Sequence, residues 1–157
     1  MVGIGAVTSL VFFTTLTFGA VDIVAIKYLV GPLYRHTFSA PGGDAVLRKV
    51  PHLIPGVVFY CIYIYGIISL VAEPALRLRN PNMTVRPGAI LGMVAYGTYA
   101  FTDLSIINNF TWTLAITDTL WGATLTAFAA YIAVWCTIRI KAAGTVAPPV
   151  YDAVNPV

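Results

Sequence analysis

Three aspartates lie inside long apolar stretches and are the residues best placed to do chemistry: Asp22, Asp103 and Asp118. A charged side chain at the centre of a bilayer is costly, so each is a functional candidate by default, as part of a proton relay or a small-ligand site. The alternative is a structural clasp, in which a carboxylate pairs with tyrosine, tryptophan, threonine or Lys27 and fixes helix register. The sequence leaves both interpretations open.

Aromatic side chains accompany these carboxylates. Tyr96, Tyr99 and Asp103 have the i, i+3, i+7 spacing of one helical face. Trp121 follows Asp118 within one helical turn. Phenol and indole donors can hydrogen-bond a carboxylate while their rings form an apolar wall around it. The sequence therefore predicts an intramembrane polar cluster made of Asp22, Tyr96, Tyr99, Asp103, Asp118 and Trp121.

Other constellations that carry chemistry are missing from the sequence. It contains no glycine-rich phosphate loop, no nucleophile elbow and no His or Cys set at metal-ligand spacing. We therefore predict no catalytic residues, no metal and no cofactor, although we expect bound lipids. The net charge of +3 comes from bases in short loops beside apolar segments, which fits lipid phosphates rather than a nucleic-acid partner.

The elements that must position these residues are transmembrane helices. Of the 157 residues, 59% are hydrophobic and 10% are charged, against about a quarter charged in soluble domains. Apolar stretches of roughly 20 residues can cross a bilayer core. The sequence predicts an all-α, integral membrane four-helix bundle in one domain, residues 1–141, with helices at about 2–29, 54–76, 89–107 and 114–140.

Amphipathic helices lying on the membrane surface are the rival to spanning helices. Such helices need a polar face on one side. The first, second and fourth stretches lack one. Spanning helices are therefore the better prediction.

Prolines and glycines mark the connections. Gly31-Pro32 predicts the end of the first helix, and Pro74 predicts a kink or end of the second, because proline cannot continue the helical hydrogen-bond ladder. Within the first loop, residues 45–50 predict a short interfacial helix. The proline-rich tail, residues 142–157, predicts an extended chain.

The third and fourth helices are predicted to form a tight antiparallel hairpin. Only Asn108-Asn109 and their neighbours separate them. Small residues at intervals of four allow two membrane helices to approach closely. This pattern predicts four helix-packing residues: Gly88, Gly92, Gly97 and Gly122. They allow close contact within the hairpin or with a partner protein.

Four crossings place both termini on one membrane face, here called side A, and the first and third loops on side B. The first and third helices end at side B and the fourth begins there, so the three aspartates share one half of the membrane. Basic residues divide almost equally, with Arg77, Arg79, Arg86, Arg139 and Lys141 on side A and Lys27, Arg35, Arg48 and Lys49 on side B. The charge balance therefore does not fix the orientation.

Two motifs carry a family resemblance. The chain resembles the uncharacterised four-helix membrane family called domain of unknown function 2177 in two motifs. The first is YGTYAFTD, from Tyr96 to Asp103, and the second is DTLWG, from Asp118 to Gly122. That family also has an aspartate late in its first helix, which Asp22 matches, and a segment similar to LYRHTF after that helix. The likeness covers about residues 11–135. It implies the fold and no known activity.

The chain departs from this family pattern at three places. Ala100 stands where the family has aspartate, Asp103 where it has asparagine, and Ala25 where it has tryptophan. A site that needs those groups in a fixed geometry would be altered. The resemblance thus implies that an ancestral activity has been lost in this chain.

Two hypotheses for the function follow. The first is a non-catalytic accessory subunit of a larger membrane complex, such as a respiratory or other energy-converting assembly, with other membrane subunits and the lipid bilayer as partners. The second is a small transporter, channel or lipid-like ligand carrier that uses the intramembrane aspartates. The expected location is the mitochondrial inner membrane, with a bacterial-type plasma membrane as the alternative.

Overall fold

The computed structural model describes residues 4–38 and 52–144. Within these ranges, four helices are long and apolar enough to cross a membrane: Ile4–Phe38, Leu53–Arg77, Pro81–Ile106 and Trp112–Lys141. The predicted all-α membrane architecture is therefore confirmed. The interfacial helix predicted at 45–50 and the tail from residue 145 onward lie outside the described residues, whereas residues 142–144 continue the last helix.

The four spans divide into shorter elements, because two of them contain a π-helical turn and one begins with a 3-10 turn. The elements in chain order are α1 (Ile4–Ala25), η1 (Ile26–Val30), α2 (Gly31–Phe38), α3 (Leu53–Ile67), η2 (Ile68–Ala72), α4 (Glu73–Arg77), η3 (Pro81–Thr84), α5 (Val85–Ile106) and α6 (Trp112–Gly144).

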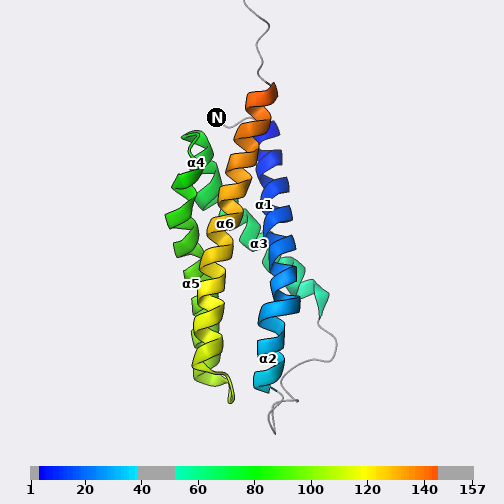
Figure 1. Cartoon of the computed structure of the whole chain (residues 1–157), viewed down its shortest axis with the longest axis vertical. Coiled ribbons are helices and arrows are strands. Elements are labelled where there is room, and N and C mark those ends of the chain that lie inside the picture. The colour runs from blue at the N-terminus through cyan, green and yellow to red at the C-terminus, as the bar shows by residue number, and fades with distance from the viewer. Residues whose placement is uncertain (1–3, 39–51, 145–157) are drawn as a thin grey trace, which may run out of the picture.

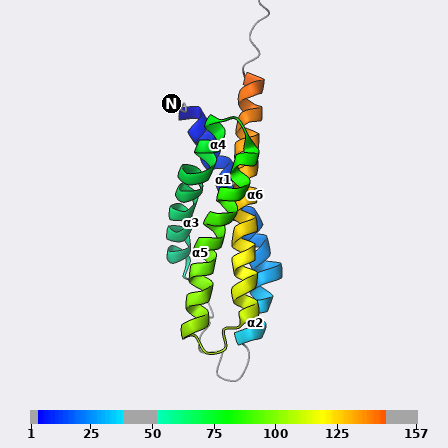
Figure 2. The same cartoon turned by 90° about the vertical axis from the view of Figure 1, so that its left-hand side faces the viewer.

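The helices form an elongated bundle in which α6 lies beside both α5 and α1 (Figures 1 and 2). Helix α3 begins higher in the bundle than the lower ends of α2, α5 and α6 (Figure 2). The lower end of the bundle, on side B, is therefore built from α2, α5 and α6 without α3. A buried apolar cluster of Phe38, Ala100, Phe110, Leu114 and Ala115 holds this end together.

Helix α1 contacts α6 through a stripe of buried residues that recur at intervals of three or four: Ala6, Leu10, Thr14, Phe18, Asp22 and Ala25. This spacing keeps the stripe on one helical face. Asp22 is one position of the stripe, so the helix that buries Phe18 also carries the carboxylate into the bundle.

The prediction that Gly31-Pro32 ends the first helix is wrong, because the helix continues to Phe38. The Gly31 N–H donates to the Ile26 carbonyl, which makes the preceding turn a π turn. Such local adjustments re-satisfy the backbone groups that a proline leaves free. A Cβ at Gly31 would lie 2.1 Å from the Ile26 oxygen, so glycine is the residue that fits this turn.

The second span uses the same arrangement. Its π turn, η2, ends directly before Glu73-Pro74, and the Glu73 N–H donates to the Ile68 carbonyl. The helix then runs on to Arg77, close to the predicted end. In both spans, therefore, a π turn ends two residues before a proline: before Pro32 in the first span and before Pro74 in the second.

The predicted hairpin between the third and fourth spans is confirmed. Helix α5 ends at Ile106 and α6 begins at Trp112. Asn109 takes a left-handed conformation with φ of 72°, which asparagine tolerates better than most residues. The Leu114 N–H donates to the Thr111 hydroxyl at 3.3 Å, which satisfies one of the free donors at the start of α6.

The four predicted packing glycines lie where α5 meets α6. A Cβ at Gly92 would lie 2.0 Å from the Gly122 carbonyl oxygen, and one at Gly88 would lie 2.8 Å from the Ala127 Cα. A Cβ at Gly122 would lie 2.2 Å from the Tyr96 ring, whereas Gly97 meets only the Thr119 side chain, at 3.3 Å. The two backbones approach so closely that a methyl group does not fit at three of these positions.

Gly92→Ala is expected to destabilise the protein by about 1–3 kcal/mol, because the new methyl group forces α5 and α6 apart. The matched control is Gly66→Ala on the second span, where an added Cβ meets nothing within 4 Å. Equilibrium unfolding in SDS measures both variants. Equal stability of the two variants would contradict the close α5–α6 contact.

Candidate functional site

Asp22 lies where three helices meet and is only 5% exposed. Its carboxylate accepts a hydrogen bond from the Tyr60 hydroxyl of α3 at 2.6 Å and another from the Trp121 indole N–H of α6 at 3.1 Å. The α1 stripe directs Asp22 at α6, and its position along the helix brings it level with Tyr60 of α3. The carboxylate therefore links α1, α3 and α6.

Asp118 is 6% exposed and lies one helical turn from Trp121 on α6. Its carboxylate accepts a hydrogen bond from the Tyr34 hydroxyl of α2. The Tyr34 ring packs against Phe38 and Phe110 in the side-B apolar cluster, with ring centroids 6.1 and 6.0 Å away. This contact exists only because the first helix continues through Gly31-Pro32.

Asp103 and Tyr99 lie at the outer edge of the same region. The Tyr99 side chain lies near the Tyr34 hydroxyl and the Asp103 carboxylate. Tyr99 is 53% exposed on the protein surface, and Asp103 is partly buried. A run of polar groups thus leads from the surface at side B inward to Asp118.

Tyr96, the sixth predicted residue, has a different place. Its ring covers Gly122 and lies 6.0 Å from the ring of Tyr63, so it forms part of an aromatic wall beside Trp121. Tyr63 shares a hydrogen bond of 2.8 Å with Thr126 of α6. The structure therefore brings Asp22 and Trp121 into direct contact, joins Asp118 and Asp103 through tyrosines, and uses Tyr96 for packing.

Two site residues were not predicted from the sequence, Tyr34 and Tyr60. Tyr34 follows Gly31-Pro32, which predicts the end of the first helix, so the sequence places it in the first loop. Tyr60 belongs to the aromatic run FYCIYIYG, which is typical of a helix core and a membrane-interface belt and does not by itself indicate a carboxylate partner. The i, i+3 spacing of Tyr60 and Tyr63 is the one signal in the sequence that both hydroxyls face the bundle.

The donors that the structure places on these two buried carboxylates are neutral phenol and indole groups. In these hydrogen bonds, therefore, neither carboxylate is paired with a positively charged donor. In the part of the chain that the structure describes, His, Cys, Asp and Glu form no group of three or more that could hold a metal ion.

More polar side chains are buried toward side A. Thr14 of α1, together with Thr126 and Thr137 of α6, is fully buried. The hydroxyls of Thr14 and Thr137 have no hydrogen-bond partner among the described residues. Buried hydroxyls of this kind are typical positions for bound water.

Tyr60→Phe is expected to lower stability by about 0.6–2 kcal/mol, the range for hydrogen bonds between membrane helices. The variant keeps the ring and removes one of the two donors on Asp22. Tyr65→Phe on the same helix is the matched control, because Tyr65 is 73% exposed. SDS unfolding measures both, and an equal change in the two variants would mean that the Tyr60 bond does not contribute.

Comparison with known proteins identifies the family of the chain but no activity. The family model described as a predicted membrane protein (DUF2177) matches residues 7–135. No curated protein and no solved structure matches the chain. The matched range contains Asp22, Asp118 and the aromatic residues that surround them.

Proposed function

The chain belongs to the DUF2177 family of predicted membrane proteins, and from that premise we propose that it is a small carrier that moves protons through the bundle by way of Asp22 and Asp118. The observation that carries this proposal is the pair of buried carboxylates, Asp22 and Asp118, whose hydrogen-bond donors are neutral. A purely structural clasp needs only a hydrogen-bond acceptor, which asparagine or threonine supplies at a lower desolvation cost.

Buried polar groups occur at several levels of the bundle. Asp118 and Thr137 are both buried on α6, and the helical rise separates them by about 28 Å. The Asp103, Tyr99 and Tyr34 groups give access from side B, and the unpaired Thr14 and Thr137 hydroxyls support a hydrated continuation toward side A.

Asp22→Asn and Asp118→Asn test this role directly, because asparagine keeps the acceptor and removes the group that exchanges a proton. The assay uses proteoliposomes with a trapped pH-sensitive dye and a membrane potential clamped by valinomycin. The wild-type protein is expected to change the lumenal pH by carrying protons across the membrane. Each variant is expected to lower this flux at least about a hundredfold, the lower end of the range that a positioned proton-transfer group contributes.

Glu73→Gln is the matched control, because Glu73 pairs with Arg77 at the opposite end of the bundle and is 31% exposed. It removes a carboxylate outside the α1–α6 contact and should leave the flux unchanged. If the two aspartate variants keep their flux as well as their stability, the carboxylates act as a clasp and the carrier proposal is wrong.

A second candidate is the accessory subunit of a larger membrane complex. Ala100 favours it, because the family resemblance leads one to expect aspartate at this position, and the chain instead has a methyl group that is fully buried in the apolar side-B cluster. Extraction in a mild detergent followed by native sizing separates the candidates. A discrete large assembly supports the subunit, and a monomer or small oligomer supports the carrier.

Either role suits a membrane that maintains a proton gradient. The mitochondrial inner membrane and a bacterial-type plasma membrane both meet this condition, and we propose the first as the location.

A further inference from the structure

An open apolar groove runs along the side-B half of the first span. One face of α1 and η1, from Ala20 to Leu29, forms one side of the groove, and Trp121 of α6 forms the other. Ala20 and Ala25 hollow it because their side chains are short. By the helical rise, the groove extends about 13 Å along the axis, which is close to half the thickness of a bilayer core.

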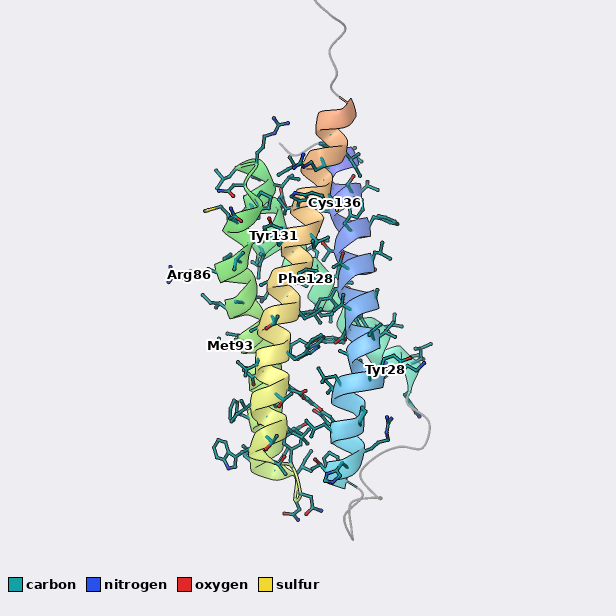
Figure 3. All side chains as sticks on the ribbon, viewed as in Figure 1. Tyr28, Arg86, Met93, Phe128, Tyr131 and Cys136 are labelled. Atoms are coloured by element: carbon teal, nitrogen blue, oxygen red, sulfur yellow. The ribbon has the colours of Figure 1, made fainter. Side chains whose placement is uncertain are left out.

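A positive charge stands at the side-B end of this groove. Lys27 is exposed, and its Nζ lies 5.0 Å from the centroid of the Tyr28 ring, which lines the groove. Tyr28 is 68% exposed and projects from the side of the bundle away from α5 (Figure 3). Both residues lie near the end of the long apolar stretch of the first span, although the helix itself continues to Phe38. Exposed tyrosine and lysine at such a place are typical of the membrane interface, where lysine extends toward the headgroups.

We propose that this groove is a binding site for one anionic phospholipid of the side-B leaflet. An acyl chain lies along Val24, Val21 and Ala20 toward the bilayer centre, and the phosphate contacts Lys27. The direction of the groove supports this occupant, because its charged end faces side B and its apolar end points inward. A lipid that lies along the membrane normal has the same polarity.

The lipid site also touches the buried carboxylate. Trp121 forms one wall of the groove and donates its indole N–H to Asp22. A chain packed against the indole ring restricts the rotation of Trp121 and so keeps this donor in place. The inference does not depend on proton transport, because lipid binding and the position of Trp121 can be measured without any flux.

Native mass spectrometry of the detergent-solubilised full chain, titrated with phosphatidylglycerol or phosphatidylcholine of identical acyl chains, tests the site. The wild type is expected to retain one phosphatidylglycerol in preference to phosphatidylcholine. Lys27→Gln should weaken phosphatidylglycerol binding about fivefold, the effect of one lysine beside an anionic headgroup, and leave phosphatidylcholine unchanged. Ala20→Leu should weaken both lipids, because it fills the groove.

Matched controls separate the site from general membrane affinity. Arg86→Gln removes a base from the opposite edge of the bundle (Figure 3), and Gly19→Leu adds the same bulk beside Ala20 where nothing lies within 4 Å. Both should bind lipid like the wild type. The proposal is overturned if Lys27→Gln or Ala20→Leu binds lipid as strongly as the wild type does. It is also overturned if inorganic phosphate alone displaces the lipid.

Discussion

The hydrogen bonds that hold Asp22 between Tyr60 and Trp121 constrain the arrangement of the whole bundle. A carboxylate surrounded by hydrocarbon must find donors inside the protein, because water is scarce and an unsatisfied acceptor is costly. The two donors come from α3 and α6, so satisfying one carboxylate fixes three helices relative to one another. Apolar side chains alone are weak at this task in a membrane, since lipid tails contact them equally well.

Close packing and backbone adjustment make that geometry possible. The glycines between α5 and α6 allow the two backbones to touch, which leaves the opposite face of α6 free for α1. The π turn before Gly31 lets the first span continue past a proline, and the added turns carry Tyr34 to Asp118. The residues that look like breaks in the sequence therefore shape the site instead of ending the elements around it.

The sequence predicts the parts of the structure that depend on composition and connectivity. Hydropathy locates the spans, since lipid imposes a minimum apolar length, and the short Asn108-Asn109 turn predicts the hairpin. Topology places Asp22 and Asp118 in one half of the membrane, but it cannot choose their donors. Tyr34 and Tyr60 are donors because of helix rotation and a π turn, and both depend on tertiary packing that no local pattern encodes.

Trp121 connects the buried and the lipid-facing sides of the molecule. Its N–H satisfies Asp22, while its ring forms a wall of the groove beside α1. Any change that moves the ring must break or lengthen the bond to the carboxylate, because both belong to one rigid indole. A group packed in the groove and the hydrogen bond to Asp22 therefore act on the same side chain, so by linkage each influences the other. This reciprocity follows from the position of one residue and requires no movement of the helices.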